Sequence, residues 1–76
     1  MILMPQQAIA ILLNGGGLRI STKGVLPITM MKYAAAARKG GARLEFVLYK
    51  GRPVMPDLLN KVAAAGGRTV LFDFVN

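Results

Sequence analysis

The stretch from residue 26 to residue 46 carries the clearest pattern of apolar and polar positions in the chain. From Pro27 to Lys39 the apolar residues follow helical spacing and include four consecutive alanines, which have the highest helix propensity. Proline suits the first turn of a helix, where its missing N–H would have no partner. Gly40 is then expected to adopt the positive φ that ends the helix. Residues 43–49 begin with polar–apolar alternation and are rich in strand-forming residues, so they predict a strand.

The same order of features, a proline, an apolar run, a glycine pair and a strand pattern, recurs after this stretch and, less regularly, before it. The later copy consists of Met55-Pro56, an alanine run, Gly66-Gly67 and a strand pattern over residues 69–75. The earlier copy consists of Met4-Pro5, the apolar run 9–13, Gly16-Gly17 and a strand pattern over residues 18–20. Self-similarity of this kind indicates three helix–strand repeats, roughly 22 to 29 residues apart. The run 9–13 alone would also fit a buried strand, so its helical assignment depends on the repeat.

Strands that alternate with helices predict right-handed crossovers and a parallel sheet. We therefore predict an α/β fold: a small parallel three-stranded sheet in the order 1-2-3, with the helices on one face. The 76 residues are expected to form a single αβ-repeat domain over residues 1–76. In general shape this arrangement resembles a fragment of a helix-and-strand solenoid such as the leucine-rich repeats. The leucine-rich consensus and its asparagine ladder are absent from the sequence.

Alternation along the strands sorts their side chains between the two faces of the sheet. The positions expected to face the helices as a core are Leu18, Ile20, Leu44, Phe46, Leu48, Val70, Phe72 and Phe74. The outer face is mixed, and we expect Val47, Tyr49 and Leu71 to form an interface there. Parallel sheets seldom leave a face uncovered, and 54% hydrophobic residues exceed what a small monomer buries easily. A homo-oligomer, or an open solenoid surface that binds a partner, would account for both observations.

Charge narrows the class of partner. Ten Lys and Arg residues against three acidic ones give a formal charge of +7, which suggests nucleic acid, another polyanion or an acidic protein. The predicted function is that of a small basic non-enzymatic binding protein with nucleic acid or another polyanion as its partner. The alternative is a protein–protein interaction or oligomerisation module, an inhibitor or adaptor of an acidic protein. In that case the charge serves only solubility or the binding of an acidic protein partner.

Two sets of basic residues are candidate anion sites. Lys23, Lys50 and Arg52 follow strands and precede helices, so they are expected at the carboxyl edge of the sheet, where α/β proteins bind ligands. The helices begin there without Ser, Thr, Asn or Asp caps, which leaves N–H groups for an anion. The secondary set, beside the glycine stops, consists of Arg38, Lys39, Arg43 and Arg68. The first set, Lys23, Lys50 and Arg52, would also fit ordinary solvated turns.

Two further expectations concern single residues. Arg19 and Arg43 are expected to be neighbours on adjacent strands, an unfavourable pair unless Glu45 or a bound phosphate relieves it. Gly15-Gly16-Gly17 precedes a strand, whereas phosphate-binding glycine loops follow one, so these glycines are expected to end a helix.

The sequence contains few of the residue types that carry out catalysis. It contains no His and no Cys, and Glu45, Asp57 and Asp73 are dispersed, so we expect no enzyme activity, metal or cofactor. No apolar run approaches the roughly 18 residues of a membrane span, and the apolar start lacks the basic region of a signal peptide. A cytoplasmic protein that does not insert into membranes is therefore the expectation.

Overall fold

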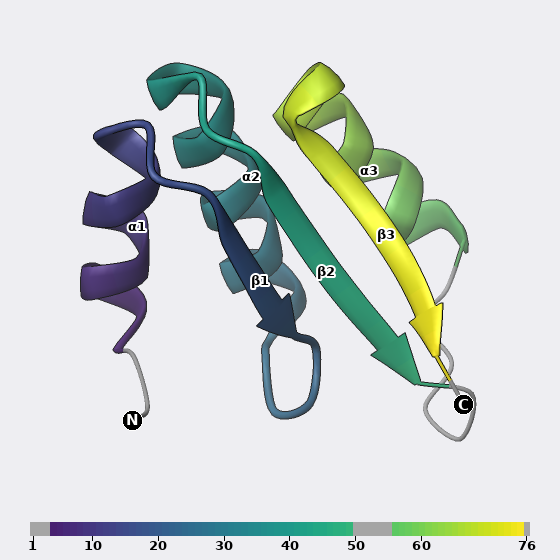
Figure 1. The fold of residues 1–76 in the computed structure, drawn as a ribbon. Helices are drawn as coiled ribbons and strands as arrows, with labels where there is room; N and C mark the ends of the chain where they lie inside the picture. The colour runs from purple at the N-terminus through teal and green to yellow at the C-terminus, as the bar shows by residue number, and fades with distance from the viewer. Residues whose placement is uncertain (1–3, 50–55, 76) are drawn as a thin grey trace.

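The computed structural model of the chain describes residues 4–49 and 56–75, in which helices and strands alternate from beginning to end (Figure 1). This confirms the predicted α/β class and shows that the first apolar run is a helix. A single 3₁₀ turn, Gly67–Thr69, precedes the last strand of the described chain. The elements are α1 (Pro5–Leu13), β1 (Leu18–Ser21), α2 (Pro27–Gly40), β2 (Leu44–Tyr49), α3 (Pro56–Gly66) and β3 (Val70–Val75).

The strands form one parallel sheet in the order β1-β2-β3, as the repeat predicts. Leu18 lies opposite Leu44, and Leu44 lies opposite Val70. Figure 1 shows the three helices behind the sheet, with α2 between α1 and α3. One face of the sheet is therefore covered by helices, and the other is free of secondary structure in the described part of the chain.

Equivalent positions in the connections from helix to strand are separated by a constant number of residues. Gly15, Gly41 and Gly67 have positive φ values of 87°, 68° and 60°, and each precedes the first residue of a strand by three positions. Successive glycines are 26 residues apart, which is also the offset between strand partners such as Arg19 and Glu45. The helices, in contrast, begin at irregular intervals. The uneven spacing of the prolines therefore hides a regular 26-residue unit.

The roles of the paired glycines differ from the prediction. The left-handed residue after α2 is Gly41, and Gly40 is the last residue of the helix. Gly40 is required for close packing, because a Cβ there would overlap the Leu12 carbonyl oxygen and lie 2.6 Å from that of Leu13. Gly66 likewise ends α3, and a Cβ there would overlap Val70 Cγ2. In these two pairs the first glycine lets elements approach and the second turns the chain, whereas in the first repeat the left-handed residue is Gly15, before the predicted pair Gly16-Gly17.

The core lies between the sheet and the helices. Its largest fully buried side chains are Phe46, Leu12, Met30, Leu44 and Val62. Most positions predicted to face the helices do so, but Phe74 is exposed, contrary to prediction. Its counterpart Leu48 on β2 is buried because α3 and β3 lie beside it, whereas β3 is the last strand of the described sheet. Alternation places Phe74 on the helix side of the sheet, and its position on the edge strand leaves it exposed.

Candidate functional site

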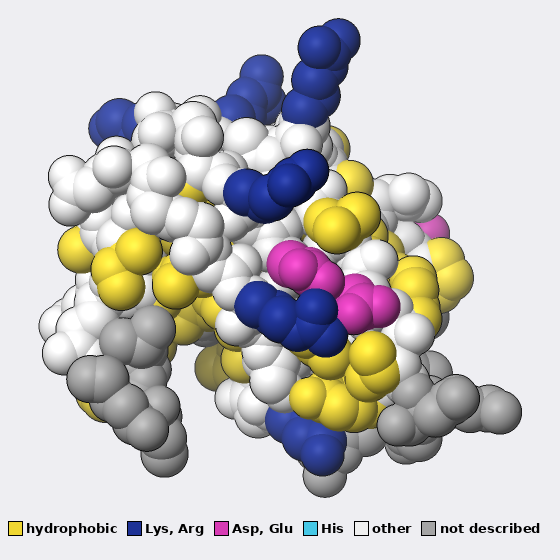
Figure 2. Space-filling model, in the orientation of Figure 1, with side chains coloured by type: hydrophobic (Ala, Val, Ile, Leu, Met, Phe, Trp, Pro, Cys, Tyr) yellow, Lys and Arg dark blue, Asp and Glu magenta, His cyan; other side chains and the backbone are white. Residues whose placement is uncertain are grey.

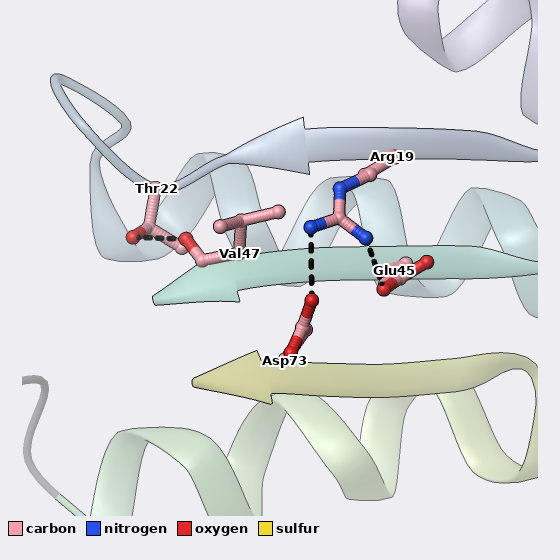
Figure 3. A network of polar contacts seen from close by, with 5 residues as sticks. All are labelled: Arg19, Thr22, Glu45, Val47 and Asp73. Atoms are coloured by element: carbon pink, nitrogen blue, oxygen red, sulfur yellow. Dashed lines mark hydrogen bonds and ion pairs between the residues drawn. The ribbon is translucent and has the colours of Figure 1, made fainter. Parts of the chain in front are cut away.

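Arg19 is the centre of an ion-pair network on the outer face of the sheet (Figure 3). Its Nη1 donates to Glu45 Oε1 at 2.7 Å, and its Nη2 donates to Asp73 Oδ2 at 2.8 Å. Glu45 is on β2 and Asp73 is on β3, so the guanidinium of a β1 residue joins all three strands. Two of the three acidic residues in the chain are therefore already paired with a cation.

The expectation that Arg19 and Arg43 are strand neighbours is wrong. The residue opposite Arg19 in the sheet is Glu45, and Arg43 precedes the first residue of β2. The Arg43 carbonyl instead accepts a hydrogen bond of 3.0 Å from the Leu18 N–H. The two arginines do line the same shallow hollow of about 190 Å³, together with Gly17. The 26-residue offset already pairs Arg19 with Glu45, so the sequence held the signal that identifies this ion pair.

Arg19→Met is expected to lower the free energy of unfolding by about 1 kcal/mol, because half-exposed ion pairs contribute little each but this side chain makes two. The loss should shrink in 1 M NaCl, where charges are screened. Urea denaturation at low and high salt measures it. Arg43→Met, which removes an arginine that makes no ion pair within residues 4–49 and 56–75, is the matched control. Equal destabilisation by both variants would contradict a structural role specific to Arg19.

The three residues predicted to form the outer-face interface have different surroundings. Val47 is buried within the chain, so it is not available to a partner. Figure 3 shows it between Thr22 and the Arg19–Asp73 ion pair. Its carbonyl accepts hydrogen bonds from Thr22 Oγ1 at 2.8 Å and from the Thr22 N–H at 3.1 Å. Tyr49 is partly buried, and Leu71 is exposed. The outer face is thus partly covered by its own polar network.

Of the favoured anion set, only Lys23 can be placed, since Lys50 and Arg52 lie outside the described residues. The Lys23 ammonium lies 4.4 Å from the centre of the Tyr49 ring, a cation–π contact. Its backbone N–H donates to Ser21 Oγ at 3.2 Å. The charge of Lys23 is therefore directed over the end of the sheet and partly satisfied by an aromatic face.

A groove of about 380 Å³ opens beside Lys23 at the carboxyl edge of the sheet. Pro5, Leu26 and Tyr33 line it, and they belong to the starts of α1 and α2 and the body of α2. Leu26 makes no side-chain cap hydrogen bond, as predicted, whereas the Met4 N–H donates to Gln7 Oε1 at 2.9 Å. Lys23 is the one charged residue among those that the structure places around this groove.

The other basic set lies along the edge where the helices end and the strands begin, which we call the glycine edge. All four of its cationic residues are exposed, and none of them forms an ion pair within the described ranges. Figure 2 shows dark blue side chains projecting along this edge, at the top of the view. Arg38 also donates from Nη1 to the Ala64 carbonyl at 3.4 Å, near the end of α3. The members of the glycine edge are Arg38, Lys39, Arg43 and Arg68.

The part of the chain that the structure describes holds no group of three His, Cys, Asp or Glu side chains able to bind a metal ion. No helix within it has the length and apolar character needed to cross a membrane. Comparison of the chain with protein-family models, curated proteins and solved structures gave no match. The observations that bear on function are therefore the charge distribution and the exposed apolar positions.

Proposed function

We propose that this chain is a small non-enzymatic binding protein that holds a polyanion, foremost nucleic acid, along the glycine edge. The observation that carries the proposal is the gathering of four exposed cations on one edge with no acidic partner among the described residues. Arg19 pairs with Glu45 and Asp73. The remaining acid, Asp57, is in the first turn of α3, at the opposite end of that helix. The four cations of the glycine edge are therefore not neutralised by an ion pair within the described residues.

The glycine edge is favoured over the carboxyl edge, which the sequence had suggested first. Lys23 already lies against the Tyr49 ring, and Asp57 brings a negative charge to the start of α3. A carboxylate in the first turn stabilises the helix but opposes an anion at the same place. At the glycine edge the ends of the helices carry partial negative charge, and Arg38 and Lys39 in the last turn of α2 offset it.

The arrangement favours contacts with phosphates over contacts with bases. Long, exposed Arg and Lys side chains along an edge can follow a phosphate backbone, whereas sequence-specific reading requires side chains that enter a groove or stack on bases. Tyr49, the aromatic residue nearest the outer face, is only partly exposed and carries Lys23 over its ring. We therefore expect weak dependence on sequence and strong dependence on salt.

The test compares two triple variants that each remove three charges. Lys39→Gln/Arg43→Gln/Arg68→Gln neutralises the glycine edge and spares Arg38, which contacts α3. Lys23→Gln/Lys32→Gln/Lys61→Gln is the matched control, and both variants have the same remaining charge. Fluorescence anisotropy with labelled single- and double-stranded oligonucleotides at 50 mM NaCl measures the affinity.

The glycine-edge variant should lose at least about tenfold in affinity, and the control about threefold or less. Each phosphate contact that a variant loses reduces the number of counterions released when the complex forms, and with it the affinity. The slope of log affinity against log salt should become shallower only for the glycine-edge variant. Equal losses would mean that overall charge, and not this edge, holds the polyanion. A parent protein that binds no nucleic acid at 50 mM NaCl would end the proposal.

A second candidate function is a protein-interaction or oligomerisation module. The observation that favours it is the exposure of large apolar residues at the β3 end of the sheet, Leu71 and Phe74. A strand edge with unpaired backbone groups is itself a surface on which another chain can pair. Association with further copies and binding of a polyanion are compatible, since the glycine edge and the β3 edge are different parts of the surface.

A further inference from the structure

Within the described residues, the middle repeat has a neighbouring repeat on both sides, whereas the repeats at the two ends have a neighbour on one side only. Because the unit is 26 residues long, each position at an end can be compared with its counterpart in the middle repeat, α2 and β2. A position that is buried in the middle and exposed at an end identifies surface that a neighbouring repeat covers in the middle of the described array. Array proteins solve this problem with polar capping repeats at both ends.

At the β3 end the missing neighbour leaves apolar surface exposed. Phe74 is 70% exposed, and its partner in register on β2, Leu48, is 2% exposed. Leu71 is exposed on the opposite face of the same strand. β3 is also the last strand of the described sheet, so one row of its backbone N–H and C=O groups has no strand beside it.

At the α1 end, two residues are exposed although the same residue types are buried 26 positions later, in α2. Met4, the N-cap residue of α1, is 61% exposed, whereas Met30, 26 residues later and within α2, is 2% exposed. Ala10 is exposed and its counterpart Ala36 is buried. Ala10 therefore marks a surface of α1 that is exposed, whereas the corresponding surface of α2 is buried in the interior of the array.

We propose that these two ends bind each other between copies of the chain, head to tail. β1 of a second copy would pair with β3 in the register that already relates successive strands, placing Leu18 of the second copy opposite Val70. Helix α1 of the second copy would then cover Phe74, as the following repeat covers Leu48. The occupant is a second copy because Ala10 repeats the alanine that is buried at position 36, and Phe74 repeats the strand position at which Leu48 is buried.

Charge supports the same register. Arg19 of the second copy would lie opposite Leu71 and diagonal to Asp73, within reach of its carboxylate. Within one chain, Arg19 on β1 forms ion pairs with Glu45 on the adjacent strand β2 and with Asp73 on β3. Between two copies, Arg19 would again face an acidic residue on a neighbouring strand. A head-to-tail contact uses two different surfaces, so it does not close on itself after two copies, and the assembly grows with concentration.

Added salt should affect self-association and polyanion binding in opposite directions. Copies of charge +7 repel one another at low ionic strength, so added salt should promote association. The same salt weakens polyanion binding. Each property can therefore fail without the other, and oligonucleotide affinity can be measured at low salt on a variant that does not associate.

The experiment is light scattering coupled to size-exclusion chromatography in 0.5 M NaCl over a concentration series. The parent should rise from the mass of one chain, 8.1 kDa, to beyond that of two. Phe74→Lys blocks the β3 end and Ala10→Lys blocks the α1 end, so each variant alone should remain a single chain. Mixed together, they retain one free end of each kind and should form a complex of two chains and no larger. Ile28→Lys, at a similarly exposed position on α2, should assemble like the parent.

Circular dichroism establishes that each variant is folded, and Met4→Lys replaces Ala10→Lys as the block on α1 if the latter loses helical signal. A parent that stays at the mass of one chain throughout the series overturns the inference. It is also overturned if the mixed variants remain single chains. If Phe74→Lys prevents association and the α1 block does not, two β3 edges pair symmetrically and the head-to-tail arrangement is wrong.

Discussion

Gly40→Ala is expected to be among the most destabilising single-methyl changes in the chain. Gly40 ends α2 at the point where this helix meets α1, and the new Cβ would overlap the Leu12 carbonyl oxygen. Carbonyl oxygens of a helix cannot rotate away as a side chain can, so α1 and α2 must separate. We expect a loss of about 3 kcal/mol or more in the free energy of unfolding, measured by urea denaturation. A domain of this size has only a small stability to lose.

Gly41→Ala is the matched control. Gly41 has a φ of 68°, and a Cβ there would meet nothing within 4 Å, so the substitution tests backbone conformation without packing. A left-handed conformation costs an alanine about 1–2 kcal/mol, and we expect a loss in that range. The order of the two effects is decisive. If Gly41→Ala destabilises more than Gly40→Ala, close packing of α1 on α2 is not what requires glycine at position 40.

Phe46→Ala is the second substitution with a large expected effect. Phe46 is fully buried at the centre of the middle strand, and its ring stacks on Phe72 with 6.2 Å between centroids. Removing it leaves a cavity between the sheet and the helices and deletes the aromatic contact. The expected loss is about 3–5 kcal/mol in the free energy of unfolding. Much of the population should then be unfolded at 37 °C, as thermal denaturation followed by circular dichroism would show.

Phe74→Ala provides the comparison for this result. The same deletion at an exposed position should cost less than about 1 kcal/mol, because little apolar surface is taken out of water by the native side chain. Alternation alone assigns both residues to the same face and would predict similar losses. A large effect at Phe74 in dilute solution would mean that this residue is covered, and the comparison should then be repeated with the non-associating Ala10→Lys variant.

Local signals in the sequence were sufficient for the order of elements and for the topology. A proline that begins each helix, an alanine run and a glycine stop predict helices and strands in alternation, and alternation implies a parallel sheet. The role of each glycine in a pair could not be predicted. It depends on where the helix ends to within a single residue, and Gly40 and Gly41 are both compatible with a helix end. Only the packing of α1 against α2 distinguishes them.

The candidate sites show a similar division. That Arg38, Lys39, Arg43 and Arg68 belong to the helix ends and the starts of strands follows from the glycine stops, so the glycine edge was predictable. The pairing of Arg19 with both Glu45 and Asp73 requires the register of three strands and the reach of a long side chain across β2. The burial of Val47 likewise results from neighbours that are distant in sequence, Thr22 and Asp73 among them.

The fixed spacing between each left-handed glycine and the strand after it has a consequence for how the chain tolerates insertions and deletions. An added residue between Gly41 and Leu44 would shift β2 against both neighbours by one position and exchange its two faces, so Phe46 would leave the core. An added residue in the connection from β1 to α2 would change only where the helix starts. The connections at the carboxyl edge can therefore diverge in length, while those at the opposite edge must keep theirs for the sheet to form.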